Sequence, residues 1–378
     1  LHGFAAMTGG DRTGAPGAVA AACAVLGGVA CLTILQAVPG LPGAHPVWAE
    51  VAAAVNPAPA GRWSRTPADA LPAILLIATS AAALWLGAHA PAAIRRAAPI
   101  AVALAAALCS AYGLLVLAVG SEQVLWLAKP AYRDAATGTF INRNAFGAFM
   151  GVALMALIGA AQRISAVRLG DTIWLAGPGA LVLAGLTLST SRGAVAATVV
   201  GLVGLLAVAA ARDGRIRAWA IAVLAAFGLG GLGIFAIGER LASAPEALAQ
   251  RAGIYRIALG AIAERPWVGH GAGSFDAVMR AARPPGFDEV VTQAHSLYLG
   301  AAVAWGVPAA LALVGAGVWL TVACARSALH GDPAGTVALG AGILLATHGL
   351  IDFAPRVPGV ALPALWLIGA GASRHAPR

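Results

Sequence analysis

Residues 297–323 read LYLGAAVAWGVPAALALVGAGVWLTVA, and no charged side chain interrupts them. A helix needs about 20 mainly apolar residues to cross a bilayer, and this stretch is longer than that. The rest of the chain has the same character, since 60% of its 378 residues are hydrophobic and only 10% are charged. A soluble domain carries roughly 25% charged residues, so the sequence predicts that lipid surrounds most of this chain.

Apolar stretches of similar length recur along the chain, separated by short polar clusters. With 297–323 included, they predict about ten membrane-spanning helices. The predicted spans are 17–38, 71–88, 98–119, 144–161, 172–189, 193–211, 218–237, 297–323, 334–350 and 357–373. The predicted fold is therefore an all-α, polytopic transmembrane helix bundle. None of these spans has Asp, Glu, Lys or Arg in its interior. Transporters usually place ionisable groups near the midplane, so a reaction at the membrane surface is favoured over transport.

Arginine marks alternate loops of this predicted bundle. Short loops rich in Arg and poor in acids, such as those with Arg95/Arg96 and Arg212/Arg215/Arg217, are typical of the cytoplasmic side. Both termini are therefore predicted to be cytoplasmic, as in a multi-pass inner-membrane protein. The net charge of +9 comes without basic clusters interleaved with aromatic residues, so nucleic-acid binding is not expected. The four cysteines have neither a disulfide framework nor zinc-ligand spacing, and no metal site or cofactor is expected.

The longest polar stretch, residues 238–296, follows the seventh predicted span and is expected on the outer side. Pro245 to Arg265 predicts a helix, which is followed by a glycine-rich turn and a short helix from Ser274. Helical periodicity directs Arg251 into the apolar face of the first helix. Two interpretations remain open. The arginine snorkels while the helix lies on lipid headgroups, or it binds an anion.

Two further arginines lie at predicted outer helix ends. Arg192 occupies the short turn Leu188–Gly193, where a planar guanidinium suits phosphate. The alternative is a simple anchor to lipid phosphates. Arg143 follows Asn142 at the start of the fourth span, where N–H donors could bind an anion or a sugar. The alternative is ordinary N-capping by asparagine.

Two acid–base candidates lie at the outer ends of later spans. His295 immediately precedes the span at 297–323 and can exchange a proton near neutral pH. Its alternative role is a polar helix cap. Asp352 follows the ninth span, where it either orients His295 or pairs with an arginine in a structural ion pair.

Six short stretches surround these candidate residues. They are GTFINRNAFG (138–147), SRG (191–193), QRAGIYR (250–256), ERPWVGHGAGSF (264–275), AHSLYL (294–299) and HGLIDF (348–353). In this order they resemble bacterial O-antigen ligases over roughly residues 138–370. The resemblance implies two parts. Residues 1–137 form N-terminal transmembrane helices, and 138–373 form an O-antigen ligase-like membrane domain containing the periplasmic loop 238–296.

The family also includes polysaccharide polymerases and protein O-oligosaccharyltransferases. The resemblance implies a metal-independent, inverting glycosyltransferase that takes a glycan from undecaprenyl diphosphate. The expected acceptor is lipid A core, or another lipid-linked glycan if the protein is a polymerase. A flippase or exporter of lipid-linked oligosaccharides is the alternative of a different class, against which the uncharged span interiors and the long outer loop argue.

The resemblance also implies roles for individual residues. Arg192 and Arg251 correspond to the donor-binding arginines, with Arg256 a second candidate for the loop position, and His295 corresponds to the essential histidine. Two departures leave the acceptor open. Ser296 stands where the family usually has Asn, and one or two N-terminal spans of the usual twelve are expected to be missing.

Overall fold

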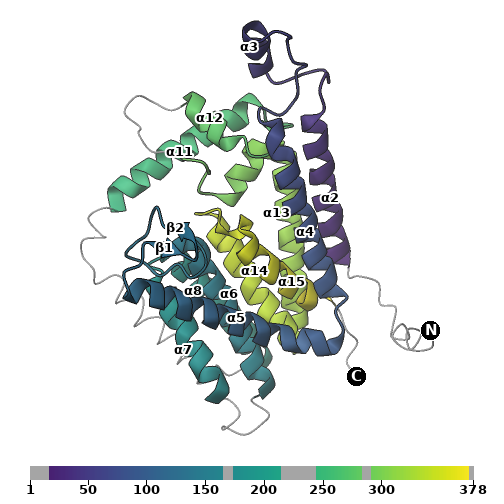
Figure 1. Cartoon of the computed structure of the whole chain (residues 1–378). Coiled ribbons are helices and arrows are strands. Elements are labelled where there is room, and N and C mark those ends of the chain that lie inside the picture. The colour runs from purple at the N-terminus through teal and green to yellow at the C-terminus, as the bar shows by residue number, and fades with distance from the viewer. Residues whose placement is uncertain (1–16, 165–172, 214–243, 283–290, 374–378) are drawn as a thin grey trace, which may run out of the picture.

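The computed structural model describes residues 17–164, 173–213, 244–282 and 291–373, and they are almost entirely helical or loop (Figure 1). The helices are α2 (Gly17–Ala37), α3 (Val47–Ala54), η1 (Pro67–Asp69), α4 (Ala70–Ala88), α5 (Ala92–Ala118), α6 (Arg143–Ile164), α7 (Ile173–Leu188), α8 (Arg192–Asp213), α11 (Ala244–Glu264), α12 (Phe275–Ala282), α13 (Leu297–Leu329), α14 (Pro333–Gly349), η3 (Ala354–Arg356) and α15 (Pro358–Ala372). Strands β1 (Gln123–Val124) and β2 (Leu127–Ala128) pair in an antiparallel hairpin.

The predicted all-α membrane fold is confirmed, whereas the number of spans is not. Nine of the ten predicted spans fall on helices, and the tenth, 218–237, lies outside the described residues. Six helices of the described part are long and apolar enough to cross a membrane. They are Gly17–Ala37, Pro67–Ala88, Ala92–Ala118, Arg143–Gln162, Arg192–Arg212 and Leu297–Leu329. Two shorter apolar helices, Trp174–Leu188 and Pro358–Ala372, accompany them.

Helix α6 forms the centre of the bundle. Its apolar window is 89% buried, against 17–39% for the other long apolar helices. It packs against α5, α7, α8 and α14. On the other side of the bundle, α4 and α15 approach closely at Gly87 and Gly369, where any side chain would overlap the backbone of the facing helix. Such close backbone contact is how membrane helices pack in the absence of a hydrophobic driving force between them.

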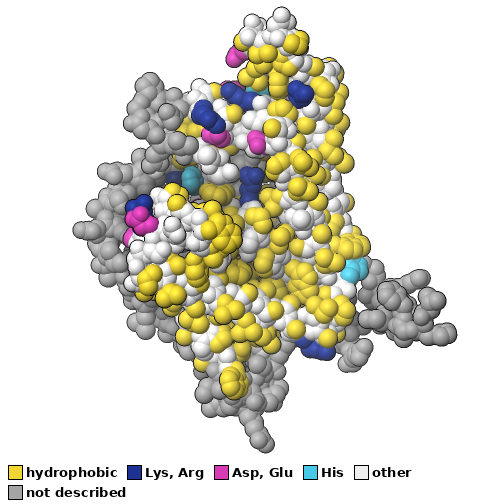
Figure 2. All heavy atoms as spheres, viewed as in Figure 1, with side chains coloured by type: hydrophobic (Ala, Val, Ile, Leu, Met, Phe, Trp, Pro, Cys, Tyr) yellow, Lys and Arg dark blue, Asp and Glu magenta, His cyan; other side chains and the backbone are white. Residues whose placement is uncertain are grey.

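The predicted outer segments gather at one end of the bundle, which we call the loop-rich end. Ser64 donates its N–H to Gln36, Arg65 donates to His270, and Ala136 donates to Leu188. At the opposite end Ser373 donates to the carbonyl of Ala88. Figure 2 shows apolar side chains over the flanks of the bundle, with charged side chains mostly near the loop-rich end. The described loops therefore lie at alternate ends of the bundle, as the order of the predicted spans requires.

Helix α13 is interrupted at Gly306, although the sequence predicts one continuous span there. Gly306 has φ 80° and ψ 168°, which is not helical. The turn after α11 fills the break, because His270 and Gly271 donate their N–H groups to the carbonyls of Val303 and Ala304. Val307 in turn donates to Pro266. The glycine-rich turn of the outer loop thereby satisfies the backbone groups that the interrupted helix leaves open.

Candidate active site

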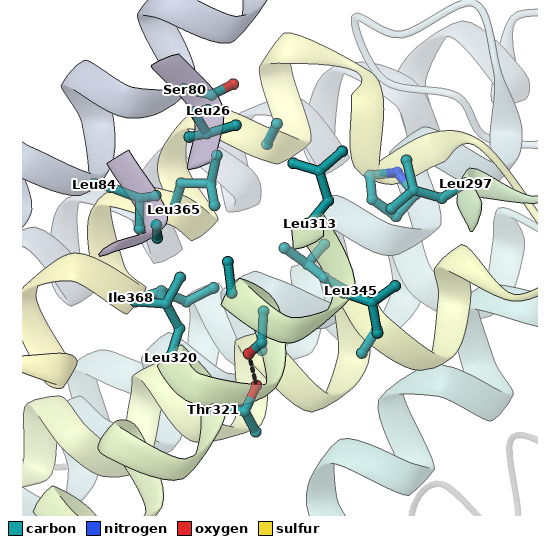
Figure 3. A pocket seen from close by; sticks show the side chains of 18 of the residues that line it. Leu26, Ser80, Leu84, Leu297, Leu313, Leu320, Thr321, Leu345, Leu365 and Ile368 are labelled. Carbon is teal, nitrogen blue, oxygen red and sulfur yellow. Dashed lines mark hydrogen bonds between the residues drawn. The ribbon is translucent and has the colours of Figure 1, made fainter. Parts of the chain in front are cut away.

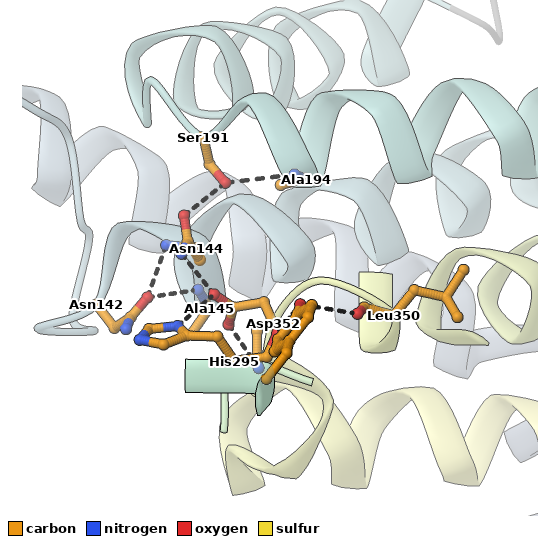
Figure 4. Close-up of polar contacts among 10 residues, drawn as sticks. Asn142, Asn144, Ala145, Ser191, Ala194, His295, Leu350 and Asp352 are labelled. Carbon is orange, nitrogen blue, oxygen red and sulfur yellow. Dashed lines mark hydrogen bonds and ion pairs between the residues drawn. The ribbon is translucent and has the colours of Figure 1, made fainter. Parts of the chain in front are cut away.

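Asp352 lies at the centre of the polar residues at the loop-rich end (Figure 4). It is 2% exposed and lies in the segment between α14 and η3. Its Oδ1 accepts the backbone N–H of Ala354 at 2.8 Å. Its Oδ2 accepts the side-chain amide of Asn144 at 2.7 Å, across 208 residues of sequence. The predicted ion pair with an arginine does not form among the described residues, because these two donors and His295 surround the carboxylate instead.

His295 faces the same carboxylate oxygen. Its Nδ1 lies 3.9 Å from Asp352 Oδ2, close enough for an ion pair but too far for a hydrogen bond. This Nδ1 is buried and has no hydrogen-bond partner within the described part of the chain. The ring also lies 5.9 Å from that of Phe353. The Asp352 carboxylate therefore faces the His295 imidazole, as the first of the two predicted alternatives requires.

The position of His295 is set by its backbone. Its φ is 48°, a left-handed conformation that is uncommon outside glycine. Tyr255 of α11 donates its hydroxyl to the His295 carbonyl at 3.0 Å. The N-cap of α13 is Ser296, whose side chain accepts the N–H of Leu299. The helix-cap interpretation of His295 is therefore wrong, because the next residue fills that position.

The charge state of Asp352 follows from these neighbours. Burial opposes its ionisation, but His295, His348, the Ala354 N–H and Asn144 outweigh burial. Together they hold the pKa of Asp352 below its usual value. Asp352 is therefore a carboxylate at neutral pH, suited to stabilise a positive charge on His295.

Asn142 and Asn144 have different roles at the start of α6. The side-chain oxygen of Asn142 accepts the N–H groups of Asn144 and Ala145, at 2.7 and 3.1 Å. This is the ordinary N-cap, so the capping alternative applies to Asn142. Asn144 instead links two parts of the site, because its amide binds Asp352 and its oxygen accepts the hydroxyl of Ser191 at 2.8 Å.

Arg143 and Arg192 lie beside this network. Arg143 donates to the hydroxyl of Thr190 at 3.2 Å, and its guanidinium lies 4.8 Å from the ring centre of Tyr132. Arg192 is exposed and begins α8, directly after Ser191. The turn that carries it is sharp, since Thr190 has φ 55°. The structure therefore brings both arginines to the end of the bundle that holds Asp352.

The two loop arginines differ in position. The half-buried Arg251 lies on α11 one turn before Tyr255. Burial raises the pKa of the Tyr255 hydroxyl, and the charges of Arg251 and Asp352 both act on it. Arg251 is therefore on the side of α11 that faces the site. Arg256 is exposed and makes no hydrogen bond or ion pair with a described residue, so the structure gives no reason to prefer it.

His348 is a residue of the site that the sequence did not single out. It is fully buried in the last turn of α14, one helical turn before Asp352, and its carbonyl accepts the Asp352 N–H. Neither ring nitrogen has a hydrogen-bond partner among the described residues. Its Nε2 lies near Gly193 of α8. The HGLIDF stretch contains this signal, but a histidine inside an apolar span has no visible partner in sequence.

Part of this site lies within a known protein family domain. Residues 178–314 match the family model of O-antigen ligase, and the match includes Arg192, Arg251 and His295. The stretches at 138–147 and 348–353 lie outside it. No curated protein matches the chain with significant similarity. The resemblance predicted from the six stretches is confirmed: the chain carries the domain of the O-antigen ligase family at residues 178–314.

Proposed function

We propose that this multi-pass membrane protein transfers a glycan from undecaprenyl diphosphate to lipid A core at the outer face of a bacterial inner membrane. The O-antigen ligase domain supports a membrane glycosyltransferase of the ligase or polymerase type. The donor and the acceptor are those that the resemblance to O-antigen ligases implies, and the side of the membrane follows from the distribution of arginine.

Arg192 is assigned to the donor diphosphate. It is the first residue of α8, so its positive charge belongs to the end of the helix that carries free N–H groups. Both favour an anion. A guanidinium also binds two phosphate oxygens in one plane and keeps its charge as negative charge grows on the leaving group. Arg251, which approaches from α11, and Arg143 would add further positive charge, so the chain's own residues could stabilise the diphosphate without a metal ion.

His295 is assigned to the acceptor hydroxyl. As the acceptor oxygen bonds to the anomeric carbon, the bond from that carbon to the diphosphate oxygen breaks. The electron pair leaves with the diphosphate, and the hydroxyl proton passes to His295 Nε2. The imidazolium so formed directs its Nδ1–H at Asp352, whose carboxylate stabilises the charge. Attack opposite the leaving group inverts the anomeric configuration.

The observation that carries this proposal is the buried carboxylate of Asp352 at 3.9 Å from His295, at the same end of the bundle as Arg192. A buried carboxylate that faces a half-buried histidine is an arrangement suited to moving a proton. A purely structural ion pair would more commonly use an arginine and a shorter distance.

The test is transfer in proteoliposomes that contain the purified chain. Glycan-labelled undecaprenyl diphosphate and lipid A core are the substrates, and labelled lipid A core is the expected product. Elongation of the lipid-linked glycan without labelled lipid A core would instead make the protein a polymerase with the same donor. Movement of intact donor across the bilayer without any transfer would refute the enzyme and support a flippase.

A further inference from the structure

An open apolar cavity of about 550 Å³ lies between α2, α4, α13, α14 and α15. In Figure 3 the side chains of Leu26, Leu313, Leu345 and Leu365 point into it from different helices. Val318, which is 57% exposed, also lines it, so the cavity opens on the flank of the bundle. In a membrane, that flank faces lipid chains.

Among the described residues, one cation lines this mainly apolar cavity. Arg356 of η3 lies at the loop-rich end, next to Pro355 and Tyr298. Its Nη1 donates to the side-chain oxygen of Gln293 at 3.3 Å. Among the described residues it has no carboxylate partner. Arg356 is half-buried, and burial also lowers the pKa of its guanidinium.

An arginine in this position has hydrogen-bond donors that remain available for a ligand. A guanidinium carries five N–H donors, and Gln293 accepts one bond. A charge withdrawn from water is costly unless an opposite charge compensates it. An anionic group at the end of the cavity would supply that charge. The combination of a long apolar cavity and one cation at its polar end is complementary to a lipid with a phosphate headgroup.

The cavity lies on a different side of the site from the proposed donor residues. No residue of α6, α7 or α8 lines it, and these helices carry Arg143 and Arg192. The segment from Asp352 to Arg356 contacts both sides. Asp352 reaches Asn144 of α6, whereas Arg356 reaches Gln293 beside α13. Displacement at an anomeric carbon needs the acceptor and the leaving diphosphate on opposite sides.

We infer that this cavity and Arg356 bind the acceptor, and that the acceptor is itself a phosphorylated membrane lipid. Its acyl chain lies among α2, α4 and α13, its phosphate contacts Arg356, and its sugar reaches His295. This inference rests on the proposed function for its direction of transfer. It excludes a soluble acceptor and gives Arg356 a positioning role separate from the donor arginines.

Binding to the purified protein in detergent tests this without requiring transfer. The probes are lipid A, its dephosphorylated form and undecaprenyl diphosphate, measured by native mass spectrometry. Arg356→Gln should weaken lipid A binding by about 10- to 100-fold, the range expected for one charge-assisted hydrogen bond. Dephosphorylated lipid A should bind the wild type weakly and should be unaffected by this change. Arg133→Gln, at an exposed arginine paired with Glu122, is the control.

A matched pair of glycines tests whether the acyl chain of the lipid occupies the cavity. A side chain added at Gly315 or at Gly317 of α13 meets no atom within 4 Å at its Cβ, and only Gly317 lines the cavity. Gly317→Leu should therefore fill the cavity and weaken lipid A binding, while Gly315→Leu should not. Neither change should affect undecaprenyl diphosphate.

Two outcomes would overturn the inference. Loss of undecaprenyl diphosphate binding in the Arg356 and Gly317 variants would make this the donor's tail site. Equal binding of phosphorylated and dephosphorylated lipid in every variant would mean that the cavity holds bulk membrane lipid only. If the binding pattern holds while the wild type transfers no glycan, the proposed function fails and the lipid site remains.

Discussion

His295 and Asp352 are held by contacts that serve position more than stability. Asp352 is fixed by two donors, and the His295 backbone is held in a left-handed conformation by Tyr255. The imidazole itself makes no hydrogen bond through Nδ1 with a described residue. This arrangement suits a general base, because Nδ1 can donate to the Asp352 carboxylate once Nε2 has taken the proton of the acceptor.

Replacement of His295 should affect transfer and leave folding intact. His295→Ala and His295→Asn should each slow glycan transfer by roughly 10²–10⁴-fold, the usual contribution of a general base. Thermal unfolding in detergent should change little, because Ser296 caps α13. Donor binding should also persist. A fully active Asn variant would exclude a role as base.

Asp352→Asn tests the partner of His295. The amide can keep the bonds from Asn144 and Ala354 only in part, and it cannot stabilise an imidazolium. We expect a lower transfer rate with an almost unchanged KM for the donor. An unchanged transfer rate would mean that Asp352 only holds α6 against α14.

Arg192→Lys distinguishes phosphate recognition from simple charge. Lysine keeps the charge but cannot form the planar two-bond contact. Transfer and binding of undecaprenyl diphosphate should both fall by about tenfold or more, as expected for the loss of one charge-assisted hydrogen bond. Arg133→Lys, at an exposed arginine, should have no effect. Similar results at the two positions would remove Arg192 from the donor site.

The break in α13 joins the outer loop to the bundle. At Gly306 a Cβ would overlap the backbone of Pro266 and Trp267, and at Gly269 it would overlap that of Ala304. Both glycines have positive φ, which permits this close approach. Because α11 carries Arg251 and Tyr255, this docked turn sets the distance between the loop residues and His295.

Gly306→Ala should destabilise the protein by about 1–3 kcal/mol or more, since the Gly306 conformation is nearly exclusive to glycine. The loss should be visible as a lower unfolding temperature in detergent. Gly315→Ala, in open space on the same helix, should leave stability unchanged or raise it slightly. Equal stability of the two variants would show that the turn does not depend on the break.

A pair of histidines holds the same turn against the segment that follows α2. His45 Nε2 lies 2.9 Å from His270 Nδ1, and His270 Nε2 lies 2.8 Å from the Ala261 carbonyl. Since Val47 donates its N–H to His45 Nδ1, both rings are neutral and each donates through Nε2. Protonation would replace an acceptor with a donor in this chain.

Stability should therefore fall in mild acid. Burial, followed by the charges of His270, Arg265 and Arg65, lowers the pKa of His45 from 6.5 to about 4. Between these two pH values the unfolded chain binds a proton at His45, whereas the folded chain does not. The stability of the folded state therefore drops as pH falls from 6.5 to about 4. Unfolding temperatures measured across this window test the prediction. His45→Gln should flatten the pH dependence.

The described helices alternate in direction, so successive loops of the described part lie at opposite ends of the bundle. Figure 1 shows α3, α11 and α12 at one end, and α15 ends beside the end of α4. Reporter fusions after residue 93 or 330 should therefore read cytoplasmic, and fusions near 55 or 130 should read external. The opposite result near 130 would place the candidate site on the wrong side for a lipid-linked donor.

Membrane spans and loop helices were predictable because their causes are local. Twenty apolar residues enter a bilayer whatever their neighbours do, so nine predicted spans coincide with helices. Pro245 and Pro266 likewise mark the ends of α11 within a residue or two. The family stretches contain Arg192 and His295 and indicate both residues without any knowledge of their contacts. The domain match contains both as well.

Contacts between distant segments could be identified only from the tertiary structure. Asn144 meets Asp352 across 208 residues, and neither hydropathy nor helical periodicity encodes that pairing. The interruption at Gly306 looks like a continuous span in sequence, because the donors that make it tolerable come from the outer loop. Arg356 resembles any loop arginine until α2, α4 and α13 assemble a cavity beside it. Lipid solvation selects helices residue by residue, whereas a polar site in a membrane protein exists only where packed helices exclude lipid from it.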